Sequence, residues 1–131
     1  MNKNVLYKER FRPQYHFSAP HGFINDPNGL IYYRGEDHLF YQYNPHDICW
    51  HAPHWGHAVS SDLIHWKHLP VALYPDELGS IFSGTVVADE DNTSGLFDGN
   101  GGLVAIFTHD LYTDERQEEY QSIAYSSDNG R

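Results

Sequence analysis

The sequence predicts an all-β chain. Helical periodicity is missing because apolar residues come in short runs, which Gly, Pro, Asn or Asp interrupt about every ten residues. Val, Ile, Tyr and Phe are common in those runs, and β-branched and aromatic residues are the types that strands favour. Seven strands are therefore predicted, at residues 30–33, 38–43, 55–60, 64–69, 82–88, 103–108 and 120–126.

An internal repeat indicates how these strands are grouped. Ala-Val-Ser-Ser-Asp at 58–62 recurs as Ala-Tyr-Ser-Ser-Asp at 124–128, a spacing of 66 residues, and the strands before each copy follow in the same order. Small four-stranded sheets of this kind are the blades of a β-propeller. The chain is predicted to hold one blade at about 29–75 and a second, at about 80–131, that lacks its fourth strand.

The connections between the predicted strands are rich in turn formers or charge. Residues 34–37 contain Gly35 and are typical of a short hairpin loop. The stretch 89–102 is rich in Gly, Asn and Asp, and 110–119 carries five acidic residues and one Arg. Both longer stretches are interpreted as solvated loops.

Charge and cysteine content exclude several classes of partner. Eight Lys and Arg stand against 18 Asp and Glu, a formal net charge of −10, so neither nucleic acid nor an anionic membrane surface is expected to bind. Cys49 is the one cysteine and cannot close an internal disulfide. The polar start Met1-Asn2-Lys3-Asn4 precedes no apolar run of signal-peptide length, so a cytoplasmic protein is expected.

The strongest local signal is Asn-Asp-Pro-Asn-Gly at 25–29, just before the first predicted strand. A tight turn explains it by itself, because Pro presets φ and Gly accepts a positive φ. The functional alternative is that the turn presents the Asp26 carboxylate beside Phe17, Phe23 and Tyr43, aromatic residues that would floor a ligand pocket. A carboxylate in that position can act as a nucleophile or a general base.

Histidines raise a second possibility. His51, His54 and His57 lie near Cys49, and imidazole and thiolate are ligands that suit zinc. Positions three apart on a strand face opposite ways, however, and Pro53 would break a helix that gathered them. No metal and no cofactor are therefore expected, with a metal-binding protein kept as an alternative.

Five motifs follow one another along residues 13–131. They are Asn-Asp-Pro-Asn-Gly at 25–29, Phe-Tyr-Gln-Tyr-Asn-Pro at 40–45, His-Trp-Gly-His-Ala-Val-Ser-Ser-Asp-Leu-Ile-His-Trp at 54–66, Phe-Ser-Gly-Thr at 82–85 and Gln-Ser-Ile-Ala-Tyr-Ser at 121–126. In this order they resemble the N-terminal part of glycoside hydrolase family 32, the group of invertases, levanases and inulinases.

The resemblance implies a five-bladed β-propeller that cleaves β-fructosidic bonds of sucrose, levan or inulin type with retention of configuration. Residues 13–131 would then be the N-terminal portion of the catalytic domain, and 1–12 a lead-in. Asp26 matches the family's nucleophile. The residues of this chain that match the family's fructosyl-binding positions are Asn25, Gln42, Trp50, Phe82 and Ser83.

The sequence also departs from the family pattern. The family more often has Trp-Met where this chain has Phe23-Ile24, and Gly where it has His51. The acid/base Glu of a Glu-Cys-Pro motif and the preceding Arg-Asp-Pro stretch do not occur. Five blades would need roughly 300 residues or more, so the chain is interpreted as a fragment without its acid/base.

Two alternatives follow from that absence. One is a non-catalytic module that binds fructan or sucrose, and the other is an inactive truncated gene product. Two blades would also leave apolar faces bare, so self-association through exposed blade faces is expected.

Overall fold

Two antiparallel sheets form the chain, and the all-β prediction is confirmed. The computed structural model describes residues 7–131, which contain no helix and thus none that is long and apolar enough to cross a membrane. Met1 to Asn4 and the first half of the predicted lead-in lie outside the described residues. The strands are β1 (Phe23–Tyr33), β2 (Glu36–Asn44), β3 (His54–Ser60), β4 (Trp66–Leu73), β5 (Ser80–Asp89), β6 (Gly102–Tyr112) and β7 (Gln117–Ser126).

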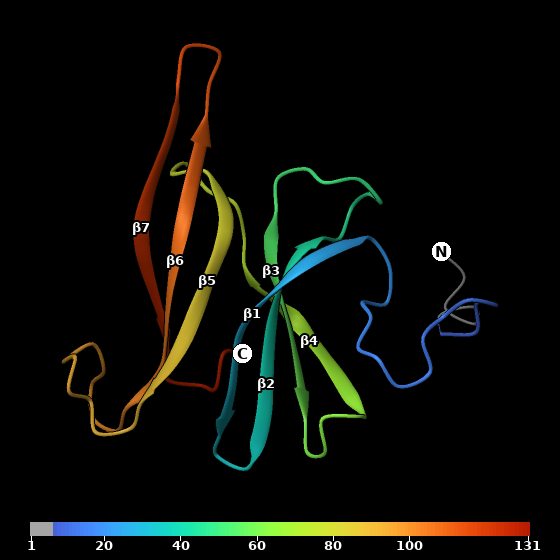
Figure 1. Cartoon of the computed structure of the whole chain (residues 1–131). Helices are drawn as coiled ribbons and strands as arrows, with labels where there is room; N and C mark the ends of the chain where they lie inside the picture. Colours follow the sequence, from blue (N-terminus) through green and yellow to red (C-terminus); the bar gives the residue numbers. More distant parts are fainter. Residues whose placement is uncertain (1–6) are drawn as a thin grey trace.

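Each sheet is a meander in which neighbours along the chain are neighbours in space. The first sheet has the order β1-β2-β3-β4 and the second the order β5-β6-β7 (Figure 1). Arg34 and Gly35 join β1 to β2 with φ of 49° and 90°, the two positive values that a tight hairpin turn of type I′ requires. This hairpin was predicted.

The two copies of the repeated Ser-Ser-Asp motif make the same side-chain hydrogen bonds. The Ser60 hydroxyl donates to Asp62 Oδ1 at 3.0 Å and accepts from the Asp62 amide at 3.1 Å. Ser126 and Asp128 make the same two bonds at 2.5 and 3.3 Å. The two copies of the motif therefore end β3 and β7 in the same way.

The motif at 25–29 is part of a strand, which corrects the prediction of a turn before the strand. β1 pairs with β2 from Phe23 onward, but its register shifts between Ile24 and Pro27 and again between Asn28 and Ile31. β1 is an edge strand of the sheet, where a proline is tolerated and bulges accommodate irregular backbone. The residues typical of a tight turn therefore form bulges within β1 instead.

The acidic stretch 110–119 is also more regular than predicted. β6 and β7 remain paired from Leu103 with Ser126 as far as Tyr112 with Gln117. Only residues 113–116 form the loop, so the two strands extend as a hairpin away from the rest of the molecule (Figure 1). The backbone ladder continues through these residues because acidic side chains on an exposed hairpin remain solvated.

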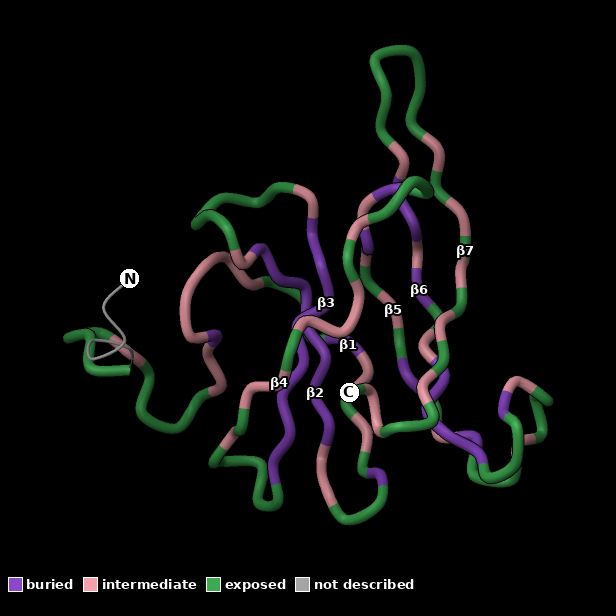
Figure 2. The backbone as a smooth tube through the Cα atoms, turned by 180° about the vertical axis from the view of Figure 1, so that it is seen from behind, coloured by how far each residue is buried: buried purple, intermediate pink, exposed green. Residues whose placement is uncertain are grey.

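The main core lies between the two sheets. From the first sheet it takes Tyr33, Phe40 and Trp55, and from the second Ile81, Val86, Leu103 and Phe107. A smaller cluster on the other face of the first sheet is Ala19, Leu39, Tyr41, Tyr43 and Ala58. β2 and β3 are consequently buried along nearly their whole length (Figure 2).

A close approach of β1 to β5 brings the sheets together. A Cβ at Gly29, whose φ is +49°, would lie 2.4 Å from Val86 Cγ2. Any larger residue at this position would therefore push the two strands apart. The chain end also returns to the first sheet, where Arg131 pairs with Glu36 at 3.0 Å.

His57, whose ring stacks on that of His38, holds that chain end. Nδ1 of His57 lies 3.1 Å from the carbonyl of Gly130, and its Nε2 lies 3.0 Å from Nδ1 of His38. The carbonyl can only accept, so His57 carries its proton on Nδ1 and accepts from His38 at Nε2. Burial and the neighbouring His38 lower the pKa of His57 to about 4.

Acid should therefore weaken the fold through His57. Its pKa in the folded state, about 4, lies below its ordinary value of 6.5. The unfolded chain consequently binds more protons between these values, and stability is full near pH 7 and falls as the pH drops from about 6.5 to 4. The loss attributable to His57 is roughly 3 kcal/mol. Urea unfolding of wild type and His57→Gln at pH 7, 5.5 and 4 measures it.

The matched control is His51→Gln, which changes an exposed histidine. We expect the pH dependence of unfolding to flatten in His57→Gln and to stay as in wild type in His51→Gln. Equal pH dependence in all three proteins would contradict a neutral, buried His57.

Candidate active site

Asp26 stands on a bulge at the edge of the first sheet. Ile24 pairs with Tyr43 and Pro27 with Tyr41, so Asn25 and Asp26 together lie opposite Gln42 alone. This two-against-one arrangement bends the strand and redirects its side chains. Asn25 and Asp26 are both exposed, and the Asn25 amide lies 3.4 Å from Asp26 Oδ1.

Ser83 reaches the same carboxylate from the second sheet. Its hydroxyl donates to Asp26 Oδ2 at 2.7 Å, which joins positions 57 residues apart in the chain. A hydroxyl and a side-chain amide beside one carboxylate provide donors and acceptors for the hydroxyl groups of a sugar. The contact also fixes the direction in which the carboxylate points.

Ser83 stands on a second bulge that is equivalent to the first. Ile81 pairs with His109 and Gly84 with Phe107, so Phe82 and Ser83 lie opposite Thr108 alone. Thr108 is 66 residues beyond Gln42, which is the spacing of the repeat. The same irregularity in both sheets therefore presents the residues that meet at Asp26.

Gln42 gives the site a buried amide. Its side chain is 2% exposed, and neither its Oε1 nor its Nε2 has a hydrogen-bond partner within residues 7–131. Buried polar groups are normally paired, and leaving one unpaired is unfavourable by about 1–3 kcal/mol. This unpaired amide belongs to the residue opposite the bulge that carries Asp26.

Aromatic side chains supply an apolar wall. Trp50, in the loop between β2 and β3, is 56% exposed, and its ring centroid lies 6.1 Å from that of Phe82 at 72°. An edge-to-face pair of this kind restricts both rings. Of the six predicted site residues, Asn25 and Ser83 contact Asp26, and Trp50 contacts Phe82. Gln42 lies in β2 opposite the bulge that carries Asp26.

The predicted aromatic floor for Asp26 is wrong in part. Phe17 packs against Tyr41 and Trp66 with ring centroids 4.9 and 5.6 Å apart. Tyr43 belongs to the same small cluster on the outer face of the first sheet. Sequence proximity suggested these residues. Tyr43 points to the other face because side chains alternate along β2, and Phe17, which precedes β1, packs on that same face.

The histidines of the alternative zinc site do not converge on one point. His51 is exposed, His54 Nδ1 lies 2.9 Å from the carbonyl of Ala52, and His57 binds the chain end as described. Cys49 is exposed and free. Within residues 7–131, no three His, Cys, Asp or Glu side chains are arranged to hold a metal ion.

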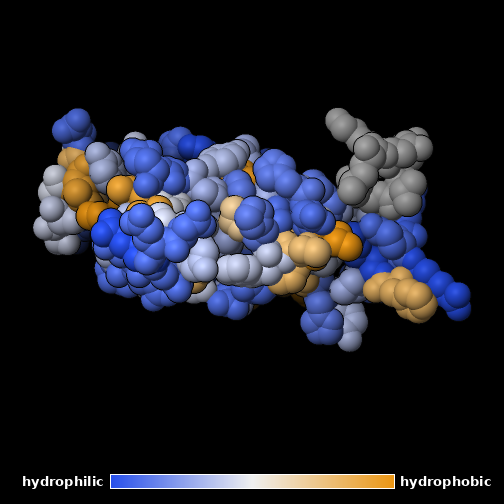
Figure 3. Space-filling view, turned by 90° about the horizontal axis from the view of Figure 1, so that it is seen from above, coloured by the Kyte–Doolittle hydropathy of each residue, from blue (hydrophilic) through white to orange (hydrophobic). Residues whose placement is uncertain are grey.

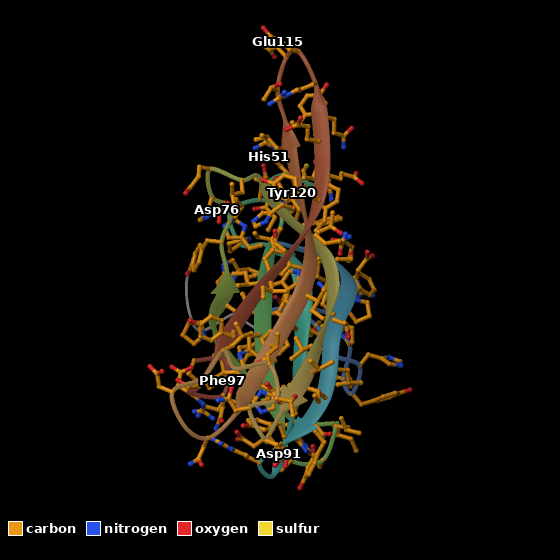
Figure 4. All side chains as sticks on the ribbon, turned by 90° about the vertical axis from the view of Figure 1, so that its left-hand side faces the viewer. His51, Asp76, Asp91, Phe97, Glu115 and Tyr120 are labelled. Atoms are coloured by element: carbon orange, nitrogen blue, oxygen red, sulfur yellow. The ribbon has the colours of Figure 1, made fainter. Side chains whose placement is uncertain are left out.

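The loop 45–53, which carries Trp50, lies toward one end of the molecule. In Figure 4, His51 and the tip of the β6–β7 hairpin at Glu115 lie toward one end, and Asp91 and Phe97 of the loop 89–102 toward the other. Viewed from above, the end with this hairpin is largely hydrophilic with separate apolar patches (Figure 3). A cleft of about 410 Å³ lies between the sheets, but its lining includes none of the six candidate residues.

Two residues beside the site were missed by the sequence reasoning. Asn28 accepts a hydrogen bond from the Gly84 amide at 3.2 Å, and the Trp55 indole donates to the Phe82 carbonyl at 3.0 Å. Both belong to motifs that were recognised, Asn28 at 25–29 and Trp55 at 54–66. Their partners are backbone groups of another sheet, which no sequence pattern identifies.

Known proteins match almost the whole chain. Residues 16–131 match the model of the glycosyl hydrolases family 32 N-terminal domain. The levanase of Bacillus subtilis is 57% identical over 126 residues, which are 95% of this chain and 18% of the levanase. The fructan beta-fructosidase of Streptococcus mutans is 52% identical over 131 residues, which are 99% of this chain and 9% of that protein.

Solved structures agree with the sequence matches. The crystal structure of exo-inulinase from Aspergillus awamori superposes with a TM-score of 0.83 at 44% identity, covering 95% of this chain and 27% of the exo-inulinase. A fructofuranosidase variant from Schwanniomyces occidentalis, complexed with fructosylnystose, superposes with a TM-score of 0.80 at 42% identity, covering 91% of this chain and 24% of that one.

These matches confirm the predicted fold class, because the N-terminal domain of such enzymes is a five-bladed β-propeller. The chain spans less than a fifth of the length of the two relatives described above. With its ordered motifs, its two sheets and the meeting of Asp26 with Ser83, the chain belongs to glycosyl hydrolase family 32.

Proposed function

We propose that the chain supplies the nucleophile and most of the fructosyl-binding surface of a retaining β-fructosidase. The observation that carries this proposal is the contact of Asp26 Oδ2 with the Ser83 hydroxyl at 2.7 Å, made by two equivalent bulges of different sheets. A carboxylate that is exposed, oriented and surrounded by neutral amides and hydroxyls fits attack on a sugar better than it fits a structural turn.

The first chemical step is a displacement at the anomeric carbon of the fructosyl unit. An Asp26 oxygen forms a bond to that carbon while the bond to the leaving oxygen breaks, and a second carboxyl group protonates the leaving oxygen. Water then cleaves the fructosyl ester of Asp26, with the second carboxyl group taking its proton. Two inversions give net retention.

The residues around Asp26 have distinct tasks in this scheme. Asn25, Gln42 and Ser83 would bind hydroxyl groups of the fructosyl unit, because their amide and hydroxyl groups both donate and accept. Trp50 and Phe82 would cover an apolar side of the ring. The unpaired amide of Gln42 favours this assignment, since a bound sugar would satisfy it.

The acid/base is proposed to come from outside these 131 residues. In retaining enzymes the two carboxyl groups are about 5–5.5 Å apart, and the partners of the Asp26 carboxylate within residues 7–131 are Ser83 and Asn25. Several glutamates are engaged elsewhere, as Glu9 is with Arg12 and Glu36 is with Arg131.

The proposed substrates are oligosaccharides or polymers with β-linked fructose at one end. This class is supported by relatives named as levanase, fructan beta-fructosidase and exo-inulinase. One structural relative is complexed with fructosylnystose. A largely hydrophilic end with separate apolar patches is the kind of surface that a chain of sugars can approach (Figure 3).

Replacing Asp26 by Asn should abolish turnover while preserving the fold. The change removes the attacking charge at nearly constant shape, so we expect kcat to fall by about 10⁴ or more. The measurement uses a chimera in which this chain replaces the matching segment of the Bacillus subtilis levanase, with levan as substrate. Asp91→Asn, at the other end of the molecule (Figure 4), is the matched control and should keep the activity. More than a tenth of the parental kcat in Asp26→Asn would refute the assignment.

The chain by itself should not hydrolyse fructosides and should self-associate. Missing general-acid catalysis lowers the rate by typically 10² to 10⁴. β7 pairs on one side only within the described residues, and one face of its sheet exposes Val87, Ile106, Ile123 and Tyr125. Two copies of this chain would cover such a face.

Light scattering on a size-exclusion column and an assay for fructose released from sucrose or inulin test both statements. A monomer at every concentration would contradict the self-association. Fructose release that Asp26→Asn abolishes would contradict the need for an external acid.

A further inference from the structure

Ser83 lies in a bulge of β5, where the regular backbone hydrogen bonding of the sheet is interrupted. Phe82 and Ser83 form the bulge opposite Thr108, and a bulge leaves backbone groups out of the regular pairing. Ser83 itself is exposed. The position of its hydroxyl relative to Asp26 therefore needs restraints from outside β5.

Trp55 provides one restraint. Its side chain is 0% exposed, and its indole Nε1 donates to the Phe82 carbonyl at 3.0 Å. The ring is packed between Phe40 and Phe107, with ring centroids 5.9 and 5.7 Å away. A fully buried indole N–H requires an acceptor, and the one it has is the peptide group immediately before Ser83.

Asn28 provides the other restraint. It is 2% exposed, and its Oδ1 accepts from the amide of Gly84 at 3.2 Å. This bond holds the peptide group immediately after Ser83. Gly29 permits the contact, because a Cβ there would collide with Val86 and separate β1 from β5.

We propose that Trp55 and Asn28 are positioning residues, which clamp the backbone on both sides of Ser83 and so set its hydroxyl against Asp26. The proposal rests on the proposed function in taking Ser83 as a fructosyl-binding residue. Neither residue touches the Asp26 carboxylate in its hydrogen bonds, so both act through Ser83. Each lies in the first sheet and binds the backbone of the second, so the geometry of the site depends on both sheets.

The clamp explains residue types that core packing alone leaves unexplained. A wholly apolar side chain at position 55 would bury no N–H donor, and an apolar side chain at position 28 would remove the unpaired Nδ2 of Asn28. The polar groups at these buried positions are explained by their hydrogen bonds to the Phe82 carbonyl and the Gly84 amide. Misplacing a binding group by about 1 Å can reduce catalysis by about 10².

The test uses the full chain, isotope-labelled for NMR. Trp55→Phe removes the donor and keeps an aromatic ring, and Asn28→Ala removes the acceptor. Asn28→Asp retains an oxygen acceptor and serves as the conservative rescue. Two controls remove comparable bonds elsewhere: Trp66→Phe, whose indole donates to Leu63 at 3.2 Å, and Asn92→Ala, whose amide donates to Phe97 at 2.6 Å.

Two quantities report on the clamp itself. We expect three-bond couplings to give one χ1 rotamer for Ser83 in wild type and in both controls, and averaging over rotamers in Trp55→Phe and Asn28→Ala. Exchange of the Gly84 amide proton should become at least about tenfold faster in Asn28→Ala and return to within about threefold of wild type in Asn28→Asp. If Asn28→Ala does not fold, Trp55→Phe decides on the Ser83 couplings alone.

A single Ser83 rotamer in every folded variant would overturn the clamp, as would equal averaging in the two controls. Titration with fructose separates this result from the proposed function. Roughly tenfold weaker binding by the two clamp variants supports both. If Ser83 loosens as expected but wild type binds no fructose, the clamp stands and the proposed fructosyl-binding role is what fails.

Discussion

The site depends on the contact between β1 and β5, the first strand of each sheet. Gly29 lets these strands approach, and the bulges at 25–26 and 82–83 then bring Asp26 and Ser83 within 2.7 Å of each other. A regular strand would send neighbouring side chains to opposite faces. The bulges place two consecutive side chains opposite a single partner residue, and that is what concentrates polar groups at one point.

The same contact connects stability to function. Trp55 belongs to the core between the sheets and also binds the Phe82 carbonyl. His57, two residues further along β3, binds the chain end through Gly130. β3 is buried along its length (Figure 2), and it holds the second sheet at Phe82 and the segment after that sheet at Gly130. Loosening the sheets is expected to disturb the site before the individual strands unfold.

Much of this arrangement could be predicted from the sequence, and the exceptions have physical reasons. The seven strands follow from local composition, and the ordered motifs contain Asp26 and Ser83, which the structure brings into contact. The bulges did not follow, because Pro27 and Gly29 signal irregular backbone without stating whether it is a turn or a bulge in an edge strand. The roles of Asn28 and Trp55 were missed because they depend on backbone groups of another sheet. Phe17 was misplaced because nearness along the chain does not determine the face on which a side chain lies.

The central claim is that Asp26 becomes covalently bonded to the fructosyl unit. It is tested most directly by rapid acid quenching of the levanase chimera during turnover of levan, followed by mass spectrometry of its peptides. The account predicts one fructosyl residue on the peptide that contains Asp26 and none on that peptide in Asp26→Asn. A fructosyl residue found on a different carboxylate would contradict it, and so would release of fructose with inverted configuration.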